Sequence, residues 1–196
     1  MENRKTWLPG FRRSACEKPF ILQFGGQRSS CQEARVGRPT AFTFYNVVVS
    51  FVVRESEPDD FESLWRMDQE CFPAGISYSR KELKAFLRGR GSFTLVATNE
   101  KDELQGFIVA FCGSSGHVIT IDVGPGSRRS GVGSLLLQGA EARMRAAGCG
   151  VVGLETAVDN TGALAFYKRH GYHVVRTYPR YYSNGVDALV LKKDLN

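Results

Sequence analysis

The sequence lacks the patterns that mark the commonest metal and nucleotide sites. Its 5 cysteines are scattered without a C-x-x-C pair, and its 3 histidines belong to no cluster with the spacing of metal ligands. No P-loop is present, and no G-x-G-x-x-G pattern fits the turn at residues 124–134, which is dense in glycine. No metal site is therefore predicted, and the P-loop and dinucleotide-binding classes are excluded.

Long hydrophobic runs and a secretion signal are also missing. No apolar stretch approaches the ~18 residues of a membrane-spanning helix. The N-terminal segment carries charge but lacks the apolar centre of a signal peptide. Cys112 and Cys149 lie among apolar residues and are expected to be reduced core thiols, as in a reducing compartment. The sequence thus predicts a cytoplasmic protein with no membrane partner.

An excess of charge is confined to the N-terminal part of the chain. Residues 1–40 carry 8 Lys and Arg against 3 Glu, whereas residues 41–196 carry 18 basic against 17 acidic residues, which together make the net charge of +6. The second part offers no broad basic surface, so no nucleic acid is predicted as a partner. Residues 1–42 have no sustained apolar face and are predicted to be a basic, disordered extension. The alternatives for residues 1–42 are a transit peptide and sequence translated from upstream of the true start.

Hydrophobic periodicity predicts one domain over residues 46–196. Strands are predicted at 47–53, 93–98, 104–112, 117–123, 151–158, 172–178 and 186–193, and helices at 56–72, 79–87, 132–147 and 160–170. Ser56 and Asn160 are expected helix N-caps, and Ser79 opens a capping box. Glu141 and Arg145 are expected to pair on an exposed helix face. The order predicts an α/β protein with a mixed sheet.

The most informative segment is ITIDVGPGSRRSGVGSLLL, residues 119–137. It predicts a strand, a turn rich in glycine and arginine, and the start of an amphipathic helix. The unpaired N–H groups and the dipole at such a helix start suit a phosphate group. Gly131 and Gly133 allow a ligand to touch the backbone, and Arg128 and Arg129 add positive charge. The alternative is a glycine-rich turn without a ligand.

The spacing V-x-P-x-x-R-x-x-G-x-G within this segment resembles the pyrophosphate-binding motif of the GNAT superfamily, the acetyl-CoA-dependent N-acyltransferases. The order of elements resembles the GNAT fold as well. The resemblance implies a twisted mixed sheet of about seven strands with helices on both faces. It also implies acetyl-CoA as co-substrate, and Val123 as the N–H donor to the thioester carbonyl. The cofactor-binding residues implied are Ile121, Val123, Arg128, Arg129, Ser130, Gly131, Val132, Gly133, Ser134 and Asn160.

Two further residues are candidates for catalysis. Tyr167 ends the pattern N-x-x-A-x-x-F-Y, in which the family's tyrosine is the general acid for the CoA sulfur; a packed aromatic ring is the alternative. Glu155 lies in the apolar strand LETAV, where burying a carboxylate costs free energy unless it has a partner or a functional role. The arrangement E-x4-N-x6-Y resembles the bacterial ribosomal-protein alanine N-acetyltransferases and implies Glu155 as general base. A plain ion pair of Glu155 remains open, and His117 and His173 are lesser candidates.

The resemblance also implies an acceptor site. It would be formed by the connection between the first two helices and by the last hairpin, with the residues Phe72, Pro73, Tyr78, Tyr181 and Tyr182. The predicted acceptor is the N-terminus of a protein or peptide. A small amine, such as a polyamine, aminoglycoside or amino acid, is the alternative, with Asp68, Glu70 and Asp187 as acidic candidates. A CoA-binding sensor without turnover is the third hypothesis.

Overall fold

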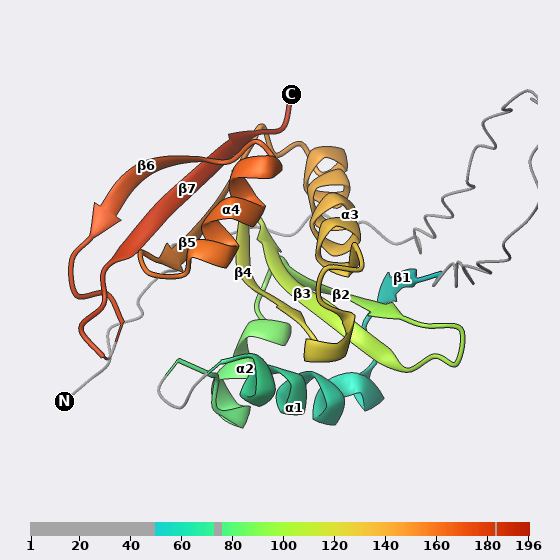
Figure 1. Cartoon of the computed structure of the whole chain (residues 1–196). Coiled ribbons are helices and arrows are strands. Elements are labelled where there is room, and N and C mark those ends of the chain that lie inside the picture. Colours follow the sequence, from blue (N-terminus) through green and yellow to red (C-terminus); the bar gives the residue numbers. More distant parts are fainter. Residues whose placement is uncertain (1–49, 73–75, 183) are drawn as a thin grey trace, which may run out of the picture.

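A computed structural model of the protein describes residues 50–72, 76–182 and 184–196 (Figure 1). The predicted extension at residues 1–42, the start of the first predicted strand and Pro73 lie outside the described residues. The strands are β1 (Val52–Glu55), β2 (Ser92–Thr98), β3 (Leu104–Cys112), β4 (Gly116–Val123), β5 (Val151–Ala157), β6 (His173–Tyr178) and β7 (Ala188–Asp194). The α-helices are α1 (Phe61–Cys71), α2 (Arg80–Leu87), α3 (Val132–Ala146) and α4 (Thr161–Arg169). Two short 3₁₀ turns lie at Pro58–Asp60 and Pro125–Ser127.

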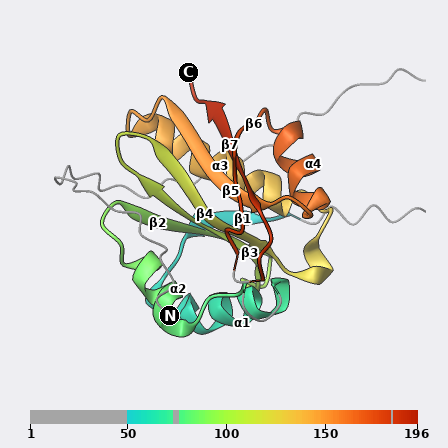
Figure 2. The ribbon, with the colours of Figure 1, turned by 90° about the vertical axis from the view of Figure 1, so that its left-hand side faces the viewer.

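The strands form one mixed sheet in the order β1-β2-β3-β4-β5-β7-β6. Every neighbouring pair is antiparallel except β4 and β5, which are parallel. Helices α1 and α2 lie on one face of the sheet, and α3 and α4 on the other (Figures 1 and 2). The predicted α/β class, with a mixed sheet of seven strands and helices on both faces, is confirmed.

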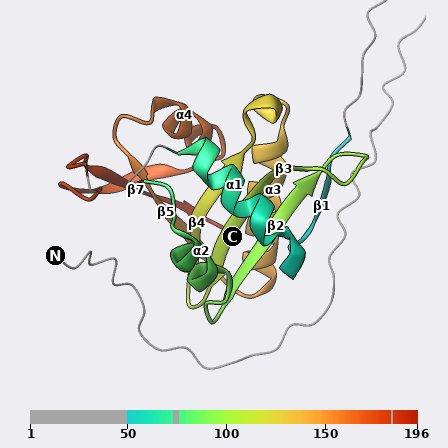
Figure 3. The ribbon, with the colours of Figure 1, turned by 90° about the horizontal axis from the view of Figure 1, so that it is seen from below.

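Each face of the sheet has its own hydrophobic core. The larger core packs α3 and α4 against the sheet through residues such as Leu136, Leu137 and Met144, which are fully buried. The smaller core lies under α1 and α2 (Figure 3) and contains Leu64, Leu83 and further side chains of β2 and β3. None of the helices in the described ranges is long and apolar enough to cross a membrane.

The predicted start of the first helix is wrong. The N–H of Ser56 bonds to the carbonyl of Thr94 on β2 at 3.0 Å, so Ser56 belongs to the sheet edge. Glu57 exchanges capping bonds with Asp60 around the 3₁₀ turn, and α1 begins only at Phe61. The two other predicted caps are confirmed, because Ser79 forms its capping box and Asn160 accepts from the N–H of Ala163 at 3.0 Å.

The predicted exposed pair of Glu141 and Arg145 is also wrong. Glu141 is 4% exposed and accepts from the hydroxyl of Tyr172 at 3.0 Å and from Lys193 Nζ at 2.6 Å. Arg145 instead donates through Nε to the carbonyl of Leu195 at 2.5 Å. Spacing along a helix shows which side chains are neighbours, whereas the position of β7 decides which of them are covered.

A β-bulge in β4 positions the site. Val109 of β3 lies opposite Thr120, but its neighbour Ala110 lies opposite Val118, so Ile119 is the extra residue. A bulge bends its strand and increases the local twist. Beyond this point β4 no longer pairs with β5, since the parallel ladder holds only Gly116 with Val152 and His117 with Gly153. The sheet therefore opens between β4 and β5, toward the end where β4 leads into α3.

Candidate active site

The open edge of β4 presents the backbone of Ile121 and Val123. Gly124 donates to the carbonyl of Gln105 at 3.0 Å, so by the alternation of an antiparallel ladder the next pair, Val123 with Gly106, is not hydrogen-bonded. The N–H and C=O of Val123, and two residues earlier those of Ile121, consequently point away from β3. The edge can thus pair with an extended ligand in the opening between β4 and β5.

The start of α3 supplies a second set of free donors. Its N-cap is Gly131, which has φ 95° and provides no side-chain cap. The N–H groups of the first helical turn, at Val132, Gly133 and Ser134, precede the first intrahelical bond, from the N–H of Leu135 to Gly131. A Cβ built on Gly131 would meet no atom within 4 Å, so the space before these donors is open. This turn can hold an anion.

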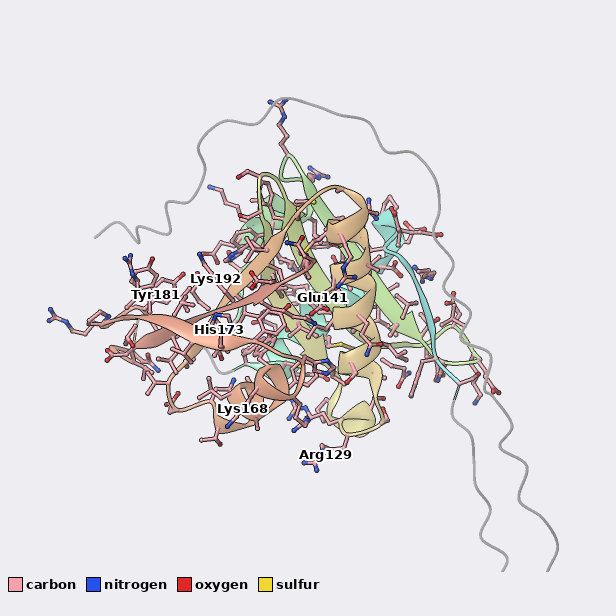
Figure 4. The ribbon with its side chains drawn as sticks, turned by 90° about the horizontal axis from the view of Figure 1, so that it is seen from above. Arg129, Glu141, Lys168, His173, Tyr181 and Lys192 are labelled. Atoms are coloured by element: carbon pink, nitrogen blue, oxygen red, sulfur yellow. The ribbon has the colours of Figure 1, made fainter. Side chains whose placement is uncertain are left out.

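The two arginines of the turn lie differently. Arg128 donates through Nε to the carbonyl of Val123 at 3.2 Å, and Cys71 Sγ lies 3.4 Å from the same oxygen. Cys71 therefore links the end of α1 to the end of β4, and Arg128 fastens the following turn to the same carbonyl. Arg129 has φ 66° and projects outward from the turn before α3, far from Tyr181 (Figure 4). Arg129 is directed away from the protein, where it can meet a charged ligand.

The remaining predicted cofactor residues have protein partners. Ser130 donates to the carbonyl of Ser127 at 2.5 Å, and Ser134 Oγ lies 3.0 Å from His170 Nε2 at the end of α4. Burial lowers the pKa of His170, so this ring is neutral around pH 7. The side-chain oxygen of Asn160 is engaged by its capping bond. A Cβ built on Gly133 would lie 3.4 Å from the ring of Phe166 on α4, so α3 and α4 are close together at this position.

The predicted acceptor segments come together from distant parts of the sequence. Tyr181 stacks on Tyr178 with ring centroids 6.0 Å apart and meets the edge of Tyr182 at 5.2 Å. Burial raises the pKa of Tyr78, and the charges of Asp122 and Asp68 raise it further, with smaller contributions from Tyr181 and Tyr182. The connection between α1 and α2 is therefore within electrostatic range of the connection between β6 and β7. Phe72 is half-buried where α1 ends.

Glu155 faces this aromatic group from β5. Its Oε2 lies 3.1 Å from His117 Nε2 on β4, and its side chain is 18% exposed. Besides burial, the charge of Glu155 raises the pKa of Tyr181, and it contributes to raising that of Tyr182 to about 12. The contact with His117 is therefore part of the environment of Glu155, whether or not the carboxylate also takes part in catalysis.

Tyr167 approaches the same region from α4. It is 6% exposed and packs edge-on against Phe166 and Tyr172. Burial raises its pKa, and the charges of Asp122 and Tyr182 raise it further. The phenol consequently keeps its proton at neutral pH, which a proton donor must do.

Asp122 of β4 was not singled out in the sequence. It is 1% exposed, and its Oδ1 accepts from Thr120 Oγ1 at 2.8 Å. Burial, more than any neighbour, raises its pKa to about 8. The signal was available, because a carboxylate in the apolar segment ITIDV is as costly as Glu155 in LETAV. Within the described residues, no group of three or more His, Cys, Asp or Glu side chains is arranged to hold a metal ion.

Comparison with known proteins identifies the class. Residues 61–172 match the model of the Acetyltransferase (GNAT) family, and the chain belongs to that family. An uncharacterized N-acetyltransferase of Methanocaldococcus jannaschii is 28% identical over 148 residues, which are 72% of this chain and 90% of that protein. An N-alpha-acetyltransferase of Caenorhabditis elegans is 26% identical over 151 residues, which are 73% and 82% of the two chains. The protein is thus an acetyl-CoA-dependent N-acetyltransferase.

Solved structures agree with this fold. The ribosomal-protein-S18-alanine N-acetyltransferase of Escherichia coli superposes with a TM-score of 0.68 at 19% identity, over 75% of this chain and 95% of that chain. NAA60 of Arabidopsis thaliana in complex with acetyl-CoA gives 0.67 at 19% identity, over 74% and 98%. Nourseothricin acetyltransferase gives 0.62 at 26% identity, over 74% and 99%.

Proposed function

We propose that the protein transfers the acetyl group of acetyl-CoA to the α-amino group of a protein or peptide N-terminus. The observation that supports the proposal is that Tyr78 lies within electrostatic range of Tyr181 and of Tyr182, whose rings are packed together, so that aromatic side chains from both connections can reach a bound peptide. The similarity to an N-alpha-acetyltransferase supports the same acceptor. Phe72 and Pro73 complete the proposed peptide-binding segment.

The cofactor is proposed to lie along the two sets of free donors. Its pyrophosphate would rest on the N–H groups from Arg129 to Ser134, and its pantetheine arm would extend along the open edge of β4 beside Ile121. The acetyl carbonyl would then accept from the N–H of Val123, which points into the opening between β4 and β5. A fixed donor at this position stabilises the negative charge that develops on the oxygen.

The chemistry then needs two proton transfers. The amine attacks the thioester carbon, the C–S bond breaks, and Tyr167 gives its proton to the departing thiolate. Glu155, acting through a water molecule, is proposed to take a proton from the amine. Its contact with His117 at 3.1 Å orients the carboxylate toward the acceptor side.

The difference in basicity between amines supports an N-terminus over a lysine side chain. An α-amino group has a pKa of ~7.7–8.0, whereas that of lysine is ~10.4. At pH 7, about one N-terminus in ten is already neutral, but fewer than about one lysine in a thousand. One carboxylate is thus sufficient to deprotonate an N-terminus and only marginal for a lysine side chain.

A small amine is the second candidate, because the structure of nourseothricin acetyltransferase is similar to this chain. The acidic residues named for it are partly engaged. Asp68 accepts from the N–H of Tyr78 at 2.7 Å, and Asp187 accepts from the N–H of Arg180 at 2.7 Å. These contacts favour a structural role for both carboxylates.

The proposal is tested by acetyl-CoA turnover against short peptides that vary in their first residue, with spermidine and free lysine alongside. At least one peptide should be acetylated on its α-amine with a higher kcat/KM than either small amine. Glu155→Gln should lower kcat most at low pH, where fewer amines are neutral. A small amine that exceeds every peptide would replace the proposed acceptor.

A further inference from the structure

Asp122 occupies a position that none of the steps above uses. The bulge at Ile119 turns Thr120 and Asp122 toward the face of the sheet that carries α1, where Phe107 of β3 lies opposite Asp122. Phe107 belongs to the core beneath α1 and α2. Asp122 therefore lies on the acceptor side of β4, next to the backbone N–H of Val123.

The carboxyl group of Asp122 is only half satisfied. Thr120 donates to Oδ1, whereas Oδ2 is buried and has no hydrogen-bond partner in the part of the chain that the structure describes. Within the same part, no Lys, Arg or His forms an ion pair with it. Leaving a buried polar atom unpaired typically costs about 1–3 kcal/mol. An unpaired oxygen near the N–H of Val123 and the acceptor tyrosines is typical of a group that binds a ligand.

The surroundings of Oδ2 favour a cation. The titratable groups that face Asp122 are Asp68 and Cys71 from α1, Tyr78 from the connection after it, and Tyr167 from α4. Each of these side chains is neutral when protonated and negative when deprotonated, so none of them supplies a positive charge. Arg128, which lies beside Cys71, donates to the carbonyl of Val123. Among the described residues, Asp122 is thus an acid that forms no ion pair with a basic side chain.

We propose that Asp122 is the counter-ion of the acceptor, whose ammonium group binds to Oδ2 before it becomes the nucleophile. The inference rests on the proposed function, because it places the amine of the N-terminus at this carboxyl. Asp122 would select primary ammonium groups, and Glu155, through its water, would pass to solvent both the proton that leaves the ammonium before attack and the proton that leaves the nitrogen after it. The residue is a binding group and does not itself form or break a bond to carbon.

The protons balance as follows. Burial raises the pKa of Asp122 to about 8, so the free protein holds it as a carboxylic acid at pH 7. The entering ammonium group displaces that proton to solvent and forms an ion pair with the carboxylate. Affinity for the amine should therefore rise between pH 6 and pH 8, as the acid loses its proton more easily.

The test compares two ligands that differ only in the amine. CoA-loaded protein is titrated by calorimetry with a peptide that the wild type acetylates and with its analogue in which hydrogen replaces the α-amino group. The wild type should prefer the amine by about 10- to 100-fold. Asp122→Asn, which keeps the bond from Thr120, should lose this preference and raise the peptide KM by a similar factor, while acetyl-CoA affinity stays the same. The exposed Asp59→Asn is the matched control and should behave as the wild type.

The outcomes separate this inference from the proposed function. The inference is wrong, and the proposed N-terminal acetylation stands, if the wild type acetylates peptides and Asp122→Asn still prefers the amine over its analogue. The same conclusion follows if only Glu155→Gln removes this preference. If only spermidine is acetylated, the proposed acceptor is wrong, and the same comparison with spermidine and its hydrocarbon analogue decides the role of Asp122. Should Asp122→Asn fail to fold, Asp122→Ser and the pH dependence of wild-type affinity replace it. Equal affinity for both ligands in the wild type would refute the inference.

Discussion

At the scale of single residues, the site contains two carboxyl groups in opposite environments. Glu155 is 18% exposed and paired with His117, whereas Asp122 is fully buried, and its one hydrogen bond among the described residues comes from Thr120. Burial favours the neutral form of an acid, and it is nearly complete for Asp122. The two groups are thus suited to different tasks, and each task can be tested by a conservative substitution.

Asp122 should make the stability of the free protein depend on pH. Its pKa is about 8 in the folded chain against the ordinary aspartate value of 3.8, so between these limits the unfolded chain ionises while the folded chain does not. The contribution of Asp122 to stability is complete below pH 4 and is lost as the pH rises to about 8. Asp122→Asn removes this loss. Urea unfolding should show the variant gaining about 1 kcal/mol or more relative to the wild type from pH 5 to pH 8, while Asp59→Asn gains nothing.

Tyr167 should matter for turnover and little for binding. Tyr167→Phe keeps the ring packed against Phe166 and Tyr172 and removes only the hydroxyl. We expect kcat to fall by roughly 10- to 10³-fold with little change in acetyl-CoA affinity. Tyr172→Phe is the control, since its hydroxyl is bonded to Glu141 away from the site. Wild-type turnover in Tyr167→Phe would make Tyr167 a core residue only.

At the scale of elements, the start of α3 and the end of β4 act together. The bulge in β4 separates the strand from β5, and the turn that follows brings the free N–H groups of α3 to the same end of the opening. A ligand that bridges both elements would be held by backbone groups, which keep their positions whatever the side chains are. This explains why glycine, rather than a specific polar residue, carries the motif.

Gly131→Val should therefore weaken CoA binding by at least about tenfold, because a side chain enters the space before the donors. The residue has φ 95°, so the substitution also strains the backbone. Gly148→Val is the matched control, since Gly148 has φ 86°, is equally open around its Cβ and lies at the other end of α3. Calorimetry on the two folded variants should show weak CoA binding only for Gly131→Val. A similar loss in both variants would assign the effect to strain.

At the scale of the whole molecule, α3 holds the two halves of the sheet together. β4 and β5 pair at only two positions, so the ladder between the halves is short. Glu141 of α3 bridges this gap by binding Lys193 of β7 and Tyr172, and Arg145 reaches the carbonyl of Leu195. The opening that the site requires is thus compensated by contacts on the opposite face.

Glu141→Gln should lower the stability of the whole domain. The substitution leaves Lys193 without its charged partner in a half-buried place, and we expect a loss of about 1.5–3 kcal/mol in the free energy of unfolding. Glu70→Gln, an exposed change on α1, should cost nothing measurable. Urea unfolding at pH 7 measures both, and equal stability of the two variants would show that the contact contributes nothing.

Much of this protein is determined by local sequence. The capping box at Ser79, the cap at Asn160 and the glycine-rich turn before α3 each depend on residues a few positions apart, and their prediction succeeded for that reason. The motif and the order of elements were likewise sufficient to indicate the family. Local patterns failed at Ser56, whose partner Thr94 lies on another strand.

Only the tertiary structure decided which side chains meet. The burial of Glu141 depends on β7, and the electrostatic coupling of Tyr78 to Tyr181 depends on two connections about a hundred residues apart. The isolation of Asp122 depends on a bulge that no short pattern marks. The physical reason is that hydrogen bonds within a turn or helix end are set by backbone geometry over a few residues. Burial and charge, in contrast, are sums over everything that packs nearby, and the chain brings those neighbours from far along the sequence.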